Sequence, residues 1–149
     1  MVVEARIPTG IDNTKRSKTL TKLDEPVHAQ GREDPNQNTG ISIINCKVAA
    51  AADLIPVKSE FRNYLGRPWK MYSRTVFLNS LMEDLIDPVG CSQLDDTFAL
   101  KTLYYGEYNN TGPGVNTSRK VTWSSYRFIT NSTTQPTSSL QISFKANNG

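Results

Sequence analysis

The chain has 149 residues, which is enough for one domain with a hydrophobic core. Hydrophobic residues make up 37% of it and charged residues 21%, and seventeen basic against fourteen acidic residues leave a net charge of +3. So small an excess excludes the strong positive field by which nucleic-acid-binding proteins attract their partners. No apolar run reaches the length of a membrane span, so neither nucleic acid nor a membrane is an expected partner.

The first 28 residues differ from the rest. Residues 1–28 show neither the alternation of a strand nor the 3.6-residue spacing of a helix, and prolines, a glycine and mixed charges interrupt them. We therefore expect a disordered arm over residues 1–28 and a folded domain over residues 29–149. The arm has no apolar run of the length that a signal peptide needs, so no signal peptide is expected in this chain.

The domain reads as a series of short strands. Residues 31–40 are rich in Asn, Asp, Pro and Gly, which predicts a loop. It leads into residues 41–48, whose β-branched and apolar side chains predict a strand. No segment has the spacing of a long amphipathic helix. Further strands are predicted at residues 74–78, at 103–108, and at 121–123 continuing toward 126–129.

Two all-β architectures fit these strands. Long loops between short strands, with nearly two-sided apolar character at residues 41–46, favour parallel strands covered on both faces, as in a solenoid of coils. A solenoid built from identical coils would show a repeat of fixed length, and none is visible. A β-sandwich fits the same pattern, so the residues themselves leave both architectures open.

Several kinds of catalytic site are excluded or unsupported. The sequence contains no G-x-S-x-G nucleophile elbow, no phosphate-binding loop and no His/Cys cluster with the spacing of zinc ligands. The single histidine, His28, lies at the edge of the predicted arm, and we expect it to be solvated. Acidic residues at 83–84, 87 and 95–96 lie in polar loops, where neighbouring carboxylates are usually solvated. We assign them no acid/base role.

The cysteines and the glycosylation motifs leave the compartment open. Cys46 and Cys91 do not have the spacing of a metal site, and they fit two thiols or one disulfide equally well. Asn109, Asn116 and Asn131 begin N-x-Ser/Thr motifs, which matter only in a secreted protein. The region is rich in Asn, Ser and Thr, so chance explains these motifs as well as glycosylation does.

The most informative cluster is Tyr-Leu-Gly-Arg-Pro-Trp-Lys at residues 64–70. Its proline-stiffened turn places the Arg67 guanidinium two residues from the Trp69 indole. A guanidinium binds carboxylates through two hydrogen bonds, and an indole face stacks on the C–H face of a sugar, so the pair suits an acidic sugar. The alternative, which spacing alone favours, is that Arg67 pairs with an internal carboxylate and Trp69 fills a gap in the core.

Leu-Gly-Arg-Pro-Trp at residues 65–69, followed by Tyr-Ser-Arg-Thr-Val at 72–76, resembles the signature of pectin methylesterases. Further similarities extend in the same order from residue 29 to about residue 133. The resemblance implies an all-β, right-handed parallel β-helix, of which this chain carries the C-terminal coils, and decides against the sandwich. The further similarities are Ala-Gln-Gly-Arg at 29–32, Asp-Pro-Asn-Gln-Asn-Thr-Gly-Ile at 34–41, Phe-Ala-Leu at 98–100, Thr-Leu-Tyr-Tyr-Gly-Glu-Tyr at 102–108, Gly-Pro-Gly at 112–114 and Val-Thr-Trp at 121–123.

The resemblance also implies a reaction and a substrate. The family hydrolyses methyl esters of galacturonate in pectin, in the plant cell wall, and without a metal or another cofactor. One aspartate attacks the ester carbonyl, a second acts as general acid and base, glutamines stabilise the oxyanion, and an arginine holds the nucleophilic carboxylate. The arginine and tryptophan of the Leu-Gly-Arg-Pro-Trp motif correspond to Arg67 and Trp69, which are therefore the expected substrate-binding residues.

Departures from the family pattern bear on activity. The catalytic aspartates belong to Gln-Asp-Thr-Leu and Asp-Phe-Ile-Phe-Gly motifs upstream of Ala-Gln-Gly-Arg; neither occurs here, and Asp12 and Asp24 stand in a different context. We therefore assign no catalytic residue and expect a truncated, inactive chain with an open stack of coils. Cys91 stands where the family has a cleft tryptophan, so one stacking face is expected to be lost. Two alternatives are a non-catalytic pectin-binding or interaction protein and a nonfunctional gene fragment.

Overall fold

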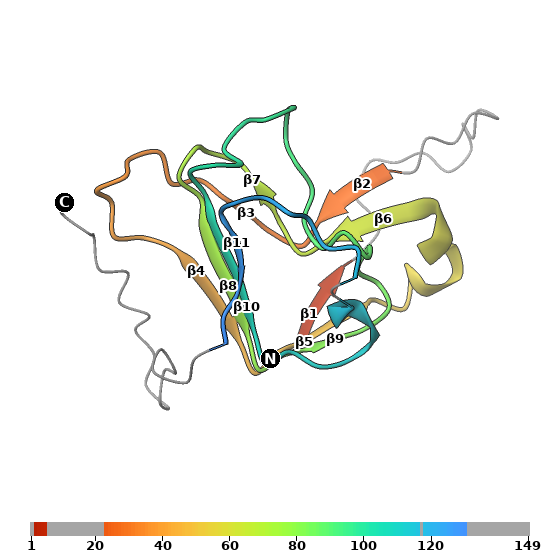
Figure 1. Ribbon diagram of the computed structural model, residues 1–149. Helices are drawn as coiled ribbons and strands as arrows, with labels where there is room; N and C mark the ends of the chain where they lie inside the picture. The colour runs from red at the N-terminus through yellow and green to blue at the C-terminus, as the bar shows by residue number, and fades with distance from the viewer. Residues whose placement is uncertain (1, 6–22, 117, 131–149) are drawn as a thin grey trace.

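The computed structural model describes residues 2–5, 23–116 and 118–130 (Figure 1). Within them the chain forms short strands and two short 3₁₀ helices, and no helix among these residues is long and apolar enough to cross a membrane. The strands are β1 (Val2–Ala5), β2 (Leu23–Pro26), β3 (Ala29–Gln30), β4 (Ile41–Ile44), β5 (Lys47–Ala50), β6 (Phe61–Tyr64), β7 (Arg67–Pro68), β8 (Arg74–Leu78), β9 (Leu81–Met82), β10 (Tyr104–Tyr108) and β11 (Tyr126–Phe128), and the helices are η1 (Ile55–Glu60) and η2 (Pro113–Val115).

The paired strands are parallel, and neighbours in a sheet come from successive passes of the chain. The largest sheet has the order β11-β10-β8-β4, a second has the order β1-β5-β9, and β2-β6 and β3-β7 form two short pairs. The backbone therefore winds as a parallel β-helix, as predicted. A β-sandwich, whose sheets are antiparallel, does not fit this pairing.

The coils differ in length, which explains why the sequence shows no fixed repeat. Ile41 lies beside Thr75, Thr75 beside Tyr105, and Tyr105 beside Tyr126, so equivalent positions are 34, 30 and 21 residues apart. The strands themselves stay three to five residues long in this sheet. The loops take up the difference.

One corner of the helix is built from an asparagine in each of three coils. Asn45, Asn79 and Asn109 have φ angles of 51°, 48° and 48°, in the left-handed region that asparagine tolerates better than most residues with a side chain. The Asn45 N–H donates to Leu78 O and the Asn79 N–H to Tyr108 O, each at 3.0 Å. Asn109 Nδ2 donates to Asn79 Oδ1 at 2.9 Å. These bonds fix the register between coils at the corner.

Val48, Leu65 and Met82 are fully buried in the core inside the coils. Residues stack in register, so that Val48 lies beside Met82 across the β5-β9 pair. Cys46 and Cys91 are both buried in this core as free thiols, which settles the alternative that the sequence left open.

The strand predictions hold at residues 74–78 and 103–108, which contain β8 and β10. The single strand predicted at residues 41–48 is divided into β4 and β5, because the chain turns the corner at Asn45. Residues 121–123 form no strand; β11 begins only at Tyr126. Apolar periodicity cannot reveal a corner at which both flanking segments stay apolar.

The expected arm over residues 1–28 does not hold in the parts that the structure describes. β1 pairs with β5, and β2 pairs with β6 over four residue pairs each. β2 then leads through residue 28 into β3, so the expected boundary falls within a coil. A four-residue strand is too short to show alternation, and its pairing partner lies far along the sequence. Residues 6–22 lie outside the described residues.

His28 is not solvated, contrary to prediction. Its ring is largely buried, with Nδ1 2.6 Å from Leu65 O and Nε2 2.6 Å from Thr75 Oγ1. A carbonyl oxygen only accepts, so Nδ1 carries the proton and Nε2 accepts from the Thr75 hydroxyl. Residue 66 must be glycine, because a Cβ there would lie 2.3 Å from the His28 ring. Burial lowers the pKa of His28 to about 4, although the Leu65 hydrogen bond acts in the opposite direction.

We expect His28 to make stability depend on pH. Its pKa is about 4 in the folded chain against 6.5 in a model peptide, so the unfolded chain binds the proton first. Its stabilising contribution is complete above pH 6.5 and is lost as the pH falls to about 4, a change of about 3 kcal/mol. Urea unfolding at several pH values should show a smaller loss for His28→Gln than for wild type. Equal losses would contradict this account.

A second prediction concerns the stability of variants at the Asn79 corner. Asn79→Ala should lower the free energy of unfolding by about 1–2 kcal/mol, because alanine does not tolerate the left-handed conformation. Asn79→Gly also loses the hydrogen bond to Asn109 but fits this conformation, so it should cost less. Urea denaturation of the two variants measures the difference. An equal loss in the two variants would show that the side-chain bond, which both of them lack, holds the corner rather than the backbone conformation.

Candidate functional site

Arg67 and Trp69 lie at the end of a short strand on the outside of a coil. β7 pairs with β3, placing Arg67 beside Ala29, and the Arg67 N–H donates to His28 O at 3.2 Å. Pro68, between the two residues, is buried, whereas Trp69 is 56% exposed. Successive residues of an extended chain point to opposite sides, so the burial of Pro68 directs Arg67 and Trp69 outward.

The exposure of Trp69 contradicts the alternative that it fills a gap in the core. Arg67 is half-buried, and its Nε donates to Ser92 Oγ at 3.0 Å. In the described part of the chain, the ion pairs join other side chains. An arginine held by a neutral hydroxyl keeps its charge for an incoming carboxylate.

Ser92 was not identified from the sequence. It comes from the next coil, which stacks on β7: the Leu65 N–H donates to Gly90 O at 2.6 Å and the Ser92 N–H to Gly66 O at 3.1 Å. The contact joins residues 25 positions apart. Nothing in the local sequence marks this position, because the loops between coils vary in length.

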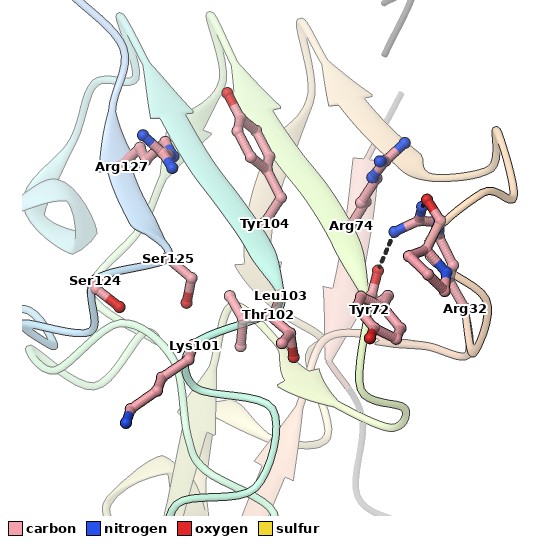
Figure 2. A pocket seen from close by; sticks show the side chains of 11 residues that line it. Arg32, Tyr72, Arg74, Lys101, Thr102, Leu103, Tyr104, Ser124, Ser125 and Arg127 are labelled. Atoms are coloured by element: carbon pink, nitrogen blue, oxygen red, sulfur yellow. Dashed lines mark hydrogen bonds between the residues drawn. The ribbon is translucent and has the colours of Figure 1, made fainter. Parts of the chain in front are cut away.

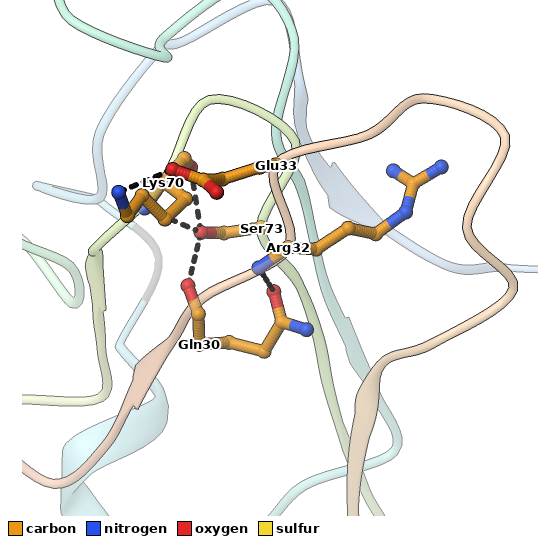
Figure 3. A network of polar contacts seen from close by, with 5 residues as sticks. All are labelled: Gln30, Arg32, Glu33, Lys70 and Ser73. Carbon is orange, nitrogen blue, oxygen red and sulfur yellow. Dashed lines mark hydrogen bonds and ion pairs between the residues drawn. The ribbon is translucent and has the colours of Figure 1, made fainter.

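A polar network fastens the turn that follows Trp69 to the preceding coil (Figure 3). Gln30 Oε1 accepts from the Arg32 N–H at 3.1 Å and from the Arg74 N–H at 2.9 Å. The buried Ser73 hydroxyl contacts Gln30 O and accepts from the Lys70 N–H at 3.2 Å. These bonds clamp the turn at residues 70–73, which directly follows Trp69.

Trp69 also touches the strand that this network holds. A Cβ added at Gly31 would lie 3.6 Å from Trp69 Cδ1, so the indole lies against the backbone of residue 31. Lys70 pairs with Glu33 on the same side (Figure 3). The position of the exposed indole is therefore set by residues 30–33 together with residues 70–73.

Comparison with known proteins identifies the family. The family model named Pectinesterase matches residues 12–143, which is most of the chain. The chain belongs to the pectinesterase family. The matched region begins well before residue 29, in agreement with the strands found inside the expected arm.

Relatives and solved structures give the extent of the similarity. A pectinesterase/pectinesterase inhibitor of Ficus pumila var. awkeotsang is 56% identical over 113 residues, which are 76% of this chain and 21% of that protein. A pectinesterase of Daucus carota is 57% identical over 107 residues, which are 72% of this chain and 34% of that protein.

The solved pectin methylesterase from carrot superimposes with a TM-score of 0.78 at 48% identity and covers 89% of this chain and 38% of that one. The Aspergillus niger pectin methylesterase gives a TM-score of 0.60 at 32% identity and covers 71% of this chain and 32% of that one. The chain therefore spans about a fifth to two fifths of the length of these pectinesterases.

Cys91, expected to mark a lost stacking face, lies in the core of this pectinesterase chain. It is 3% exposed, and burial together with the nearby Glu107 carboxylate raises the pKa of its thiol. Glu107 forms a buried ion pair with Lys120, with 2.9 Å between Lys120 Nζ and Glu107 Oε1. The side chain at position 91 therefore packs inward and presents no face to the exterior.

The loop carboxylates have surface roles. Glu83 pairs with Lys47 and Asp84 with Lys58, each at 2.7 Å, and all four side chains are substantially exposed. Asp87 Oδ1 accepts from the Val89 N–H at 3.1 Å. Among the described residues, no three potential metal ligands gather at one place.

Gln30 should be a positioning residue for Trp69. Gln30→Ala removes the acceptor of two backbone N–H groups and should cost about 2 kcal/mol of stability. In a Trp123→Phe background, Trp69 is the single tryptophan, and its emission, excited selectively over that of the tyrosines, should shift as the turn loosens. Gln37→Ala is the matched control, because residue 37 contributes its backbone carbonyl to Arg32 and its side chain is exposed. Equal shifts in both variants would show that Gln30 does not position Trp69.

Proposed function

We propose that this chain carries the pectin-binding part of a pectin methylesterase, with Arg67 and Trp69 as the residues that contact methyl-esterified galacturonate. The observation that carries the proposal is an indole that is 56% exposed, two residues from an arginine bound to a neutral hydroxyl. The names of the carrot and Aspergillus niger structures support pectin as the substrate. Because pectin is extracellular, the cell wall is the proposed location.

The two side chains have different roles. The Trp69 indole offers a flat apolar face to the C–H face of a sugar ring, and burying that face favours binding. Ser92 engages Arg67 Nε, which leaves the terminal nitrogens of the guanidinium to bind a carboxylate. That carboxylate is a nucleophilic aspartate during hydrolysis, or the free acid once the ester has been cleaved.

Hydrolysis by the family's route needs two carboxylates in sequence motifs that this chain does not contain. Ester cleavage by this route requires a nucleophile and a general acid at the same ester, and neither family motif that carries them occurs in the sequence. The carboxylates of Glu83, Asp84 and Asp87 are engaged by lysines or by backbone. We propose that this 149-residue chain binds pectin and releases no methanol.

A binding assay with a methanol assay on the same samples tests this proposal. The full chain, shown to be folded by circular dichroism, should bind highly methyl-esterified pectin and release no methanol above background. Trp69→Ala should weaken binding about tenfold, because it removes the apolar face that stacks on the sugar ring. Phe128→Ala is the matched control, since Phe128 is also an exposed aromatic residue, at 45%.

The outcomes separate the two parts of the proposal. Methanol release at a rate that saturates with pectin would disprove the claim that the chain cannot hydrolyse the ester. Equal binding by wild type, Trp69→Ala and Phe128→Ala would disprove the role of Trp69. A chain that folds but binds no pectin would disprove the binding function itself.

A further inference from the structure

A second site candidate lies on the outer face of the β11-β10-β8-β4 sheet (Figure 2), which is a different sheet from the β3-β7 pair that carries Arg67. It is an open pocket of about 370 Å³, here called the basic pocket. Arg74, Tyr104 and Arg127 project into it from the adjacent strands β8, β10 and β11. Lys101 and Arg32 line its ends.

The lining is strongly cationic. Four of its side chains carry a positive charge, those of Arg32, Arg74, Lys101 and Arg127, and none of the described residues that line it is acidic. The whole chain has a net charge of only +3, so positive charge is concentrated here. A pocket lined by one sign of charge concentrates counter-ions of the opposite sign.

Arg32 contributes to this positive potential from inside the fold, where the backbone holds its side chain in place. It is 3% exposed, and its guanidinium donates to the backbone carbonyls of Gln37 at 2.7 Å and Tyr72 at 3.0 Å, and also to that of Pro35. These acceptors are neutral, so they satisfy its hydrogen bonds without cancelling its charge. The Arg32 charge, after burial, is the second cause that lowers the pKa of Arg74. The Arg32 charge therefore adds to the positive potential at Arg74.

Aromatic rings accompany the cations. The Arg32 guanidinium lies 5.7 Å from the centre of the Tyr72 ring, and the Arg127 guanidinium lies 5.4 Å from that of Tyr104. Of the two, Arg127 is exposed, and its position over the ring pre-orients it, which lowers the entropy lost on binding a carboxylate. The exposed cations Lys101 and Arg127 come from different segments that line this pocket, so they can contact different carboxylates of an extended chain.

We propose that the basic pocket binds the free carboxylates of de-esterified galacturonan. This inference rests on the proposed function, because de-esterified galacturonan is the product of methyl-ester hydrolysis. The methyl ester is neutral and attracts the cations only weakly, whereas each hydrolysed unit presents a carboxylate that can pair with them. The two sites therefore differ in their contacts: at the Arg67/Trp69 site the exposed indole stacks on the esterified sugar beside a single guanidinium, whereas several cations of the basic pocket retain the stretch already converted.

Charge reversal at the two exposed cations of the pocket tests this proposal. Lys101 and Arg127 are exposed, so Lys101→Glu and Arg127→Glu should leave the fold intact, which circular dichroism verifies. The matched control is Arg119→Glu, which makes the same charge change at an exposed arginine outside the pocket lining. Binding of each full-length variant to polygalacturonate and to highly methyl-esterified pectin is measured by calorimetry at low and high salt.

We expect wild type to prefer polygalacturonate at low salt. Each pocket variant should bind it about tenfold more weakly and should bind esterified pectin as wild type does, while Arg119→Glu stays within about twofold of wild type. The preference should shrink at high salt, because the contacts are electrostatic. Equal weakening by all three variants would reduce the effect to net charge and overturn the proposal, as would a wild-type chain with no preference for polygalacturonate.

Trp69→Ala in the same assay separates this inference from the proposed function. If the proposed function fails, esterified pectin does not bind or does not respond to Trp69→Ala, but polygalacturonate still responds to Lys101→Glu and Arg127→Glu. If the pocket proposal fails, the reverse pattern appears, with esterified pectin dependent on Trp69 and polygalacturonate indifferent to Lys101 and Arg127.

Discussion

The structure depends on lateral hydrogen bonding between coils whose corner requires a left-handed backbone. Asn45, Asn79 and Asn109 supply that conformation in three successive coils, and each of the first two donates its N–H to a strand of the next coil. With the corner fixed, the flanking strands must align, so β4, β8 and β10 lie in register and the apolar side chains inside them stack. Packing, and then the site, follow from this alignment.

The Arg67/Trp69 site is assembled from three coils. The strand that carries both residues pairs with β3 of the preceding coil, whose residue 31 supports the Trp69 indole. The following coil supplies Ser92, which holds the Arg67 guanidinium. A change in coil register would separate these groups, so the site is a consequence of stacking. The same stacking places cations of β8 and β11 on one outer face.

The fold accommodates buried ionisable groups in three ways. Lys120 and Glu107 pair directly, with side chains 1% and 5% exposed, so their charges cancel inside the fold. Arg32 is equally buried but is bound by carbonyl oxygens, so its charge is satisfied by hydrogen bonds and its field persists at the surface. His28 takes a third course and stays neutral between Leu65 and Thr75. The fold therefore keeps a positive field near Arg32, whereas it cancels charge at the Lys120–Glu107 pair and avoids charge at His28.

The sequence by itself determined the all-β class, the strands at residues 74–78 and 103–108 and the pectinesterase family, because these depend on local patterns of side chains. Its asparagines after strands, at positions 45, 79 and 109, also held a corner signal that apolar periodicity overlooked. Only the tertiary structure decided that residues 2–5 and 23–26 are strands, that His28 and Cys91 are buried, that Trp69 is exposed, and that Ser92 holds Arg67. Each of these features depends on which coils are neighbours. The loops between coils differ in length, so the local sequence does not predict which strands pair.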